Sequence, residues 1–186
     1  GSVSAYVGAM GVALGTMVSN LSAHKRGWDD RWEEFSIWAD KGQEFMKKLV
    51  AFVDEDTQAF NKIMDAFKLP NGNDAEKAIR KQAIQIATKY AIEVPFTVME
   101  TAFSSMQVIL AMAKSGNPNS ASDAGVGALC ACMAVKGAYL NVKINSADLD
   151  DKDYVKEILE KGSEIIEKSE LLEKEILSIV EHNILH

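Results

Sequence analysis

A carboxylate on the apolar face of an expected helix is the clearest candidate for chemistry in this sequence. Between residues 49 and 67, apolar side chains recur at intervals of three and four, which predicts an amphipathic helix. These apolar positions are Leu49, Phe52, Val53, Phe60, Ile63, Met64 and Phe67. Asp56 lies three residues after Val53 and four before Phe60, so it falls on the apolar face. Asp54 falls on the opposite, polar face.

Burial gives Asp56 two alternative roles. A carboxyl group among core positions loses hydration, which favours its protonated form unless a partner is present. A protonated carboxyl group near neutral pH is a general acid, so catalysis is one reading of Asp56. The other reading is a structural residue that hydrogen-bonds a neighbouring helix.

Other polar residues are candidates for binding a ligand. Lys25 and Arg26 follow the first expected helix, where cations complement the helix dipole. On an otherwise acidic protein the same pair is a possible docking patch for an anionic tail.

Two further pairs lie at helix ends. Ser122 and Asp123 open a later expected helix, and capping explains both residues. Asn141 and Asn145 lie four residues apart near a helix end. They either satisfy backbone groups or direct their amides at a ligand, and their spacing favours neither.

Most of the usual catalytic constellations are absent from the sequence. It contains no phosphate-binding loop, no dinucleotide glycine fingerprint and no Glu-x-x-His signature of a di-iron bundle. His24, His182 and His186 have no metal-ligand spacing to one another, and nothing brings a histidine to a catalytic serine. We therefore expect no metal site.

Length and charge limit the class of protein. With 186 residues, the chain is long enough for one well-buried core, so residues 1–186 are expected to form a single domain. A net charge of -7 and a pI near 5.0 argue against nucleic acid as a partner. Cys130 and Cys132 lie two apart in a helical pattern and cannot bridge each other, which suits a reducing compartment such as the cytoplasm.

The hydrophobic periodicity predicts an all-α fold, an antiparallel bundle of five to seven helices. The proline in the third helical segment, Pro95, predicts a kink or short break after Val94. Ser2 to Asn20 carries no charge and resembles a membrane span, but its many small and polar residues favour a helix packed in a soluble core. The expected segments are 3–21, 29–67 as one helix or two, 75–114, 121–143 and 151–182.

Five short motifs in order resemble the cyclodeaminase domain of the formimidoyltransferase-cyclodeaminase family and its stand-alone relative, methenyltetrahydrofolate cyclohydrolase. They cover essentially the whole chain, although family members usually begin with a Pro-rich and Gly-rich lead, so the lead is expected to be truncated here. The motifs are Gly1-Ser2-Val3-Ser4-Ala5, Val53-Asp54-Glu55-Asp56 with Ala59-Phe60, Val94-Pro95, Gly116-Asn117 with Ser122-Asp123, and Gly137-Ala138-Tyr139 with Asn141-Val142 and Ile144-Asn145.

The resemblance implies an all-helical homodimer with a folate site between subunits. By motif, Asp56 matches the acidic residue assigned to catalysis, and Lys25 with Arg26 would hold the glutamate tail. The implied reaction closes the methenyl bridge of formimidoyltetrahydrofolate with release of ammonia, in histidine degradation and one-carbon metabolism, without a cofactor. The remaining residues expected to bind substrate are Ser2, Ser4, Asn117, Ser122, Asp123, Asn141 and Asn145.

Three functions stay open at this point. The first is the cyclodeaminase, fused to or channelling with a formimidoyltransferase domain, as the run Gly27 to Trp32 suggests by its likeness to transferase-fused forms. The second is hydrolysis of the methenyl bridge by water. The third is a helical module without catalysis that dimerises or binds a ligand.

Overall fold

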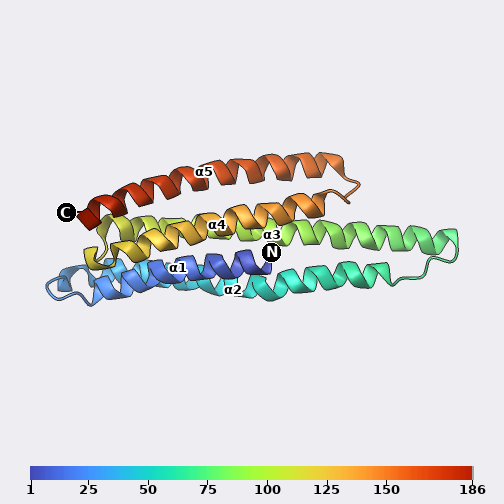
Figure 1. The fold of residues 1–186 in the computed structure, drawn as a ribbon. Helices are drawn as coiled ribbons and strands as arrows, with labels where there is room; N and C mark the ends of the chain where they lie inside the picture. The colour runs from blue at the N-terminus through green and yellow to red at the C-terminus, as the bar shows by residue number, and fades with distance from the viewer. Residues whose placement is uncertain (186) are drawn as a thin grey trace.

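Five long α-helices lie side by side in the computed structural model, which describes residues 1–185 (Figure 1). His186, weighed above as a metal ligand, lies outside the described residues. The expectation of an all-α bundle is confirmed. In chain order the elements are α1 (Ser2–Ala23), η1 (Asp29–Arg31), α2 (Trp32–Phe67), α3 (Asp74–Ser115), η2 (Pro118–Ser120), α4 (Ala121–Ser146) and α5 (Lys152–Leu185).

The arrangement of the helices leaves one end of the bundle thinner than the other. Helices that follow one another in the chain run antiparallel (Figure 1). Helix α1 lies between α2 and α4, and α5 lies on α3 and α4. The hairpin of α2 and α3 extends beyond the other helices. The N-terminus lies near the middle of the bundle, so α1 covers only part of the hairpin.

Turn chemistry explains where the helices end. After α1 the chain turns at Gly27, whose φ of 85° lies in the left-handed region that favours glycine. The α2–α3 turn ends at Asn73, whose side chain accepts a hydrogen bond from the Glu76 N–H at 2.9 Å and caps α3. The N-cap residue of α4 is Ser120, so Ser122 and Asp123 lie inside its first turn instead of capping it.

Small residues set the closeness of α1 and α4. A Cβ added at Gly11 would lie 2.8 Å from the carbonyl oxygen of Gly127 and 3.0 Å from the amide of Ala131. The two backbones therefore pack almost directly on each other, as the small-residue spacing predicts. The alanines of α4 expected to pack closely are all buried: Ala121, Ala124, Ala128, Ala131, Ala134 and Ala138.

Pro95 does not interrupt α3. The helix is continuous from Asp74 to Ser115, so a short break after Val94 does not occur. Val94, Val98 and Met99 flank the proline and are all buried in the core, so packing supports the helix through this turn.

The apolar face of α2 is covered over only half its length. Leu49 is fully buried, but Phe60, Met64 and Phe67 are 61, 43 and 48% exposed. The expectation that these three residues belong to the core is therefore wrong for one chain. The reason is topological: α1 begins at Ser2 beside the middle of α2, and no helix lies over the rest of this face.

Three stretches are long and apolar enough to cross a membrane by length and composition, namely Ser2–Ala23, Asp74–Ser115 and Pro118–Ser146. In the bundle, 50, 50 and 56% of their most apolar windows are buried. The polar residues Thr16, Ser19 and Ser22 of α1 are buried, and each hydroxyl donates to the carbonyl four residues earlier. Helix packing thus covers about half of this apolar surface.

Candidate active site at the start of helix α1

The first residues of α1 meet Asp56 of α2 at the middle of the bundle. The Ser2 N–H donates to Asp56 Oδ2 at 2.8 Å, and the Ser2 hydroxyl lies 2.7 Å from the same oxygen. The hydroxyl also lies 3.1 Å from the carbonyl oxygen of Val53. Asp56 therefore accepts a hydrogen bond from a free N–H group at the start of α1. In most helices, the N-cap residue of the same helix provides this acceptor.

Gly1 allows this approach because it has no side chain. A Cβ at position 1 would lie 1.7 Å from Asp56 Oδ1, closer than any non-bonded contact. The backbone nitrogen of Gly1 lies 3.7 Å from Asp56 Oδ2. Position 1 thus has to be glycine for the carboxylate to keep its place.

The surroundings of Asp56 differ from the apolar burial expected from the sequence. Its side chain is 25% exposed, and it accepts two hydrogen bonds, one from the N–H and one from the hydroxyl group of Ser2. Donors and the positive end of a helix dipole stabilise an ionised carboxylate. Asp56 is thus less buried than its place on the apolar face predicts, and it makes the contact with a neighbouring helix that the structural reading expects.

A cavity of about 110 Å³ lies beside this carboxylate. It brings together three residues singled out in the sequence, Asp56, Asn141 and Asn145. Its other walls are Ala59, Phe60, Ile63 and Ala91. Three helices, α2, α3 and α4, therefore contribute to one small polar cavity.

Both asparagines of this cavity use their side-chain nitrogens to bond main-chain carbonyls. Asn145 Nδ2 donates to the carbonyl oxygen of Ala91 at 2.7 Å, and Asn141 Nδ2 donates to that of Gly137 at 3.1 Å. Their side-chain oxygens accept no hydrogen bond within residues 1–185. Together with Asp56 they make a pocket lined by acceptors, which suits a ligand rich in N–H groups or carrying positive charge.

Ser4 lies on the contact between α1 and α4, two residues and about half a turn along α1 from Ser2. Its hydroxyl oxygen is 2.6 Å from the point where a Cβ of Gly137 would be. Ser4 therefore stands beside the turn of α4 whose carbonyl holds Asn141. Of the ten residues expected at the site, Ser2, Ser4, Asp56, Asn141 and Asn145 are brought together.

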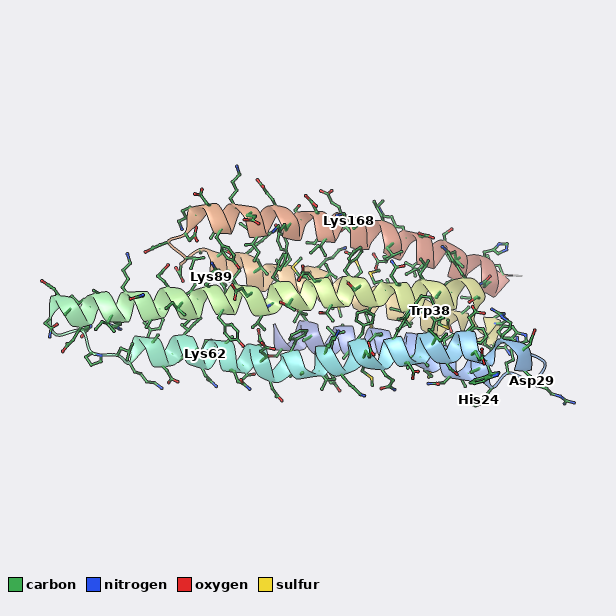
Figure 2. All side chains as sticks on the ribbon, turned by 180° about the vertical axis from the view of Figure 1, so that it is seen from behind. His24, Asp29, Trp38, Lys62, Lys89 and Lys168 are labelled. Atoms are coloured by element: carbon green, nitrogen blue, oxygen red, sulfur yellow. The ribbon has the colours of Figure 1, made fainter. Side chains whose placement is uncertain are left out.

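The other five expected site residues lie at the far end of α1. The helix has 22 residues, which is about 33 Å at 1.5 Å per residue. Figure 2 shows His24 and Asp29 at this end, far along the bundle from Lys62 and Lys89. The five residues are Lys25, Arg26, Asn117, Ser122 and Asp123.

Contacts at the far end are mostly structural. The Lys25 ammonium group lies 4.0 Å from the centroid of the Trp28 ring. The Asn117 N–H donates to the Ser22 hydroxyl at 2.7 Å, and its side chain accepts from the Asn119 N–H at 3.2 Å. Arg26 and Ser122 are exposed. Within one chain, this group cannot share a small ligand with Asp56.

A second hollow, which the sequence reasoning missed, lies on the outer side of the α2–α3 hairpin. Its volume is about 700 Å³, and its walls include Ala66, Ile86 and Tyr90. The Tyr90 hydroxyl donates to Glu55 at 2.9 Å, and burial followed by this contact raises the pKa of Tyr90. Lys62 covers the Tyr90 ring at 3.7 Å. No motif or spacing in the sequence points to this groove.

Comparison with known proteins gives a family for the whole chain. The family model described as Formiminotransferase-cyclodeaminase matches residues 1–180. A methenyltetrahydrofolate cyclohydrolase of Methylorubrum extorquens is 32% identical over 184 residues, which is 99% of this chain and 88% of that protein. The formimidoyltransferase-cyclodeaminase of Gallus gallus is 33% identical over 97% of this chain, which spans 34% of the chicken protein.

A solved structure agrees with this assignment. The crystal structure of a formiminotetrahydrofolate cyclodeaminase from Thermotoga maritima superposes with a TM-score of 0.84 at 28% sequence identity. The match covers 98% of this chain and 87% of that chain. The whole bundle, including the helices that hold Asp56, is therefore similar to that fold.

Proposed function

The chain belongs to the formiminotransferase-cyclodeaminase family, and we propose from this membership that it converts a tetrahydrofolate derivative at the Asp56 pocket. The proposed reaction is closure of the methenyl bridge of formimidoyltetrahydrofolate with loss of ammonia. The observation that supports it is the acceptor-lined pocket around Asp56, Asn141 and Asn145.

The charge of the substrate fits this pocket. A formimidoyl group on a tetrahydrofolate nitrogen is an amidine, which carries a delocalised positive charge when protonated. An ionised carboxylate pairs with such a cation, and amide oxygens accept from its N–H groups. Asp56, pinned by Ser2, supplies the carboxylate in a fixed position.

In this reaction Asp56 acts first as a general base and then as a general acid. The neighbouring folate nitrogen attacks the formimidoyl carbon, and a new C–N bond forms. Asp56 accepts the proton that this attacking nitrogen loses. It then delivers the proton to the former imino nitrogen, which leaves as ammonia while the methenyl cation forms. The carboxylate ends ionised, as it began, and no cofactor is required.

Hydrolysis of the methenyl bridge is the second candidate, because the 32% identical relative is named a methenyltetrahydrofolate cyclohydrolase. In that reaction water attacks the methenyl carbon, and Asp56 accepts its proton. Asp56 then gives this proton to one of the two folate nitrogens as its C–N bond breaks, while the hydroxyl loses its proton to solvent and leaves a formyl group on the other nitrogen. The methenyl group is also a delocalised cation, so the same pocket suits it. The two reactions differ in the nucleophile and in whether ammonia is released.

Two assays on one preparation separate the candidates. We expect ammonia release from formimidoyltetrahydrofolate together with the appearance of methenyltetrahydrofolate. Consumption of methenyltetrahydrofolate without activity on the formimidoyl compound would select the hydrolase instead. If neither substrate reacts and neither raises the melting temperature, the remaining candidate is the module without catalysis, because a ligand that binds the folded form stabilises it.

An exposed apolar face supports a second proposal, that two copies of the chain form a homodimer. The side chains lie on adjacent helices at intervals that place them on one face, and each is between 38 and 77% exposed. They are Val3, Tyr6, Met10, Met17 and Leu21 of α1, and Val126, Leu129, Met133, Leu140 and Ile144 of α4. We call this set the α1–α4 face. Apolar patches of this kind mark interaction sites.

The Asp56 pocket lies at the edge of this face. Phe60, which lines the pocket, and Leu140 and Ile144, which flank its asparagines along α4, are 61, 65 and 71% exposed. A second copy seated on the face would cover these side chains and shut water out of the pocket. We therefore propose that the folate site lies between two copies. We also propose that Lys25 and Arg26 dock the glutamate tail and that the protein works in the cytoplasm.

A further inference from the structure

Pro95 removes a hydrogen-bond donor from α3 at the level of the Asp56 pocket. In an α-helix each N–H donates to the carbonyl four residues earlier, so the carbonyl of Ala91 would pair with the N–H of residue 95. Proline has no N–H, and its ring presses against the carbonyl at that position. The carbonyl of Ala91 is therefore left without its helical partner, although α3 continues through Pro95.

Asn145 of α4 replaces the missing donor. Its Nδ2 lies 2.7 Å from the carbonyl oxygen of Ala91. Ala91 is buried, and a buried carbonyl without a donor is costly, so this hydrogen bond has a strong reason to persist. Ala91 and Asn145 both line the pocket beside Asp56.

This bond decides which end of the amide a ligand meets. An asparagine amide has a donor end and an acceptor end, and either can face a pocket. Because one N–H of Nδ2 donates to Ala91, the amide is held in one orientation, and its oxygen, which accepts no hydrogen bond within residues 1–185, remains for the ligand. If residue 95 carried an N–H, Ala91 would be satisfied within α3 and would no longer fix the amide.

We propose that Pro95 is a positioning residue of the Asp56 pocket. It acts through Ala91 and Asn145 and keeps the Asn145 oxygen directed at an N–H group of the ligand. Two separate motifs of the sequence, Val94-Pro95 and Ile144-Asn145, therefore act together to orient one side-chain amide. The class of ligand rests on the proposed function, whereas the coupling of Pro95 to Asn145 does not.

The first test is Pro95→Ala. Removing a proline from a helix interior raises the melting temperature by about 5 °C or more. We expect the same variant to bind tetrahydrofolate derivatives about three- to tenfold more weakly, as for the loss of one hydrogen bond. A proline with a merely structural role predicts the change in melting temperature with unchanged affinity. Thr97→Ala, two residues along α3, is the control and should leave affinity unchanged.

The second test needs no ligand. Asn145→Ala leaves the carbonyl of Ala91 without a donor only while Pro95 is present. We therefore expect Asn145→Ala to lower the melting temperature by several degrees in the native background and by clearly less in the Pro95→Ala background. Equal losses in both backgrounds would overturn the coupling.

Nuclear magnetic resonance detects directly whether the environment of the Asn145 side-chain amide changes. The side-chain amide signals of Asn145, assigned by their loss in Asn145→Asp, should shift in Pro95→Ala and stay in place in Thr97→Ala. Unchanged signals in Pro95→Ala would mean that Ala91 accepts both donors, and the proposal would fail. If no folate derivative binds any variant, the proposed function fails while the melting and resonance data still decide the role of Pro95.

Discussion

Asp56 joins two helices and faces the pocket at the same time. Both hydrogen bonds from Ser2 go to Oδ2, and within residues 1–185 Oδ1 accepts none. One oxygen thus anchors the start of α1, and the other stays available to a ligand. A structural role and a catalytic role are compatible here, because the anchor fixes the geometry that proton transfer requires.

Replacing Asp56 separates these roles. Asp56→Asn keeps the volume and one acceptor oxygen but cannot carry a proton between substrate nitrogens. We expect turnover to fall by about two to four powers of ten. Stability should fall by about 1 kcal/mol, because a weaker acceptor then caps α1.

The matched control for this prediction is Asp54→Asn. Asp54 lies two residues away on the exposed face of α2, so both turnover and melting temperature should stay near native values. Near-native turnover of Asp56→Asn would remove Asp56 from catalysis and leave only its contact with Ser2.

Sequence reasoning identified Asp56 because helical spacing is a local signal. It did not predict the partner, since Ser2 lies 54 residues earlier and only the packing of α1 on α2 brings them together. Ser2 was expected to bind substrate, yet both of its donors are used by Asp56. For Asn145 the spacing left two roles open, and the structure shows the backbone contact to Ala91.

At the scale of helices, the position of the site depends on how closely α1 approaches α4. The contact of Gly11 with Gly127 sets this distance, because no side chain separates the two backbones. Shifting α1 outward by even a fraction of an ångström would move Ser2 relative to Asp56.

Gly11→Ala tests the packing of these two helices. The added methyl group would meet the carbonyl oxygen of Gly127 at 2.8 Å, which the backbone cannot avoid without moving. We expect a loss of about 1–3 kcal/mol in the free energy of unfolding, measured by denaturant titration. Gly8→Ala on the same helix is the control, since its methyl group meets side chains at 3.2 Å or more. Its better helix propensity should offset much of that crowding.

The boundaries of the helices were largely predictable, because residues such as Asn73 and Gly27 end or begin helices through local backbone preferences. The sequence did not predict, however, which segment covers the apolar face of α2. The periodicity of Phe60 and Phe67 is the same whether a helix of this chain or a second copy lies over them. Periodicity therefore marks an apolar face but does not say what covers it. The same limit applied to Asp56, because its spacing did not reveal the hydrogen bonds from Ser2.

At the scale of the whole molecule, Lys25 and Arg26 lie about 33 Å from the Asp56 pocket along α1. Lys25→Ala combined with Arg26→Ala should therefore leave the affinity for a monoglutamyl folate nearly unchanged. Affinity for a polyglutamylated folate should fall, and more so at low salt, because exposed charges act through a screened field. Isothermal titration with both ligands at two salt concentrations measures this. An equal loss for both ligands, independent of salt, would leave Lys25 and Arg26 only their role at the helix end.

The proposed homodimer predicts that assembly and activity are linked through the α1–α4 face. Its ten exposed apolar side chains belong to the two helices that also supply Ser2, Asn141 and Asn145. A charge in this face should prevent a second copy from docking without touching the pocket itself. Leu129 suits this test, because it is 48% exposed and lies 12 residues before Asn141, about 18 Å along α4.

Leu129→Glu should convert a dimer into a monomer, as measured by light scattering at micromolar concentration. Turnover should fall with it, because the pocket loses the cover that a second copy provides. Leu171→Glu on α5, where Leu171 is 67% exposed, is the control and should change neither property.

Cysteine labelling tests independently whether a second copy covers the α1–α4 face. Burial raises the pKa of the Cys132 thiol, so at pH 8 it stays protonated and reacts slowly with iodoacetamide. Labelling then reports Cys130, which is partly exposed beside Gly11 at the junction of α1 and α4. We expect Cys130 to react slowly in the native protein and faster in Leu129→Glu, because only the monomer leaves it open to solvent. A native protein that is monomeric, labels quickly at Cys130 and turns over at the full rate would show that the pocket of one chain is sufficient.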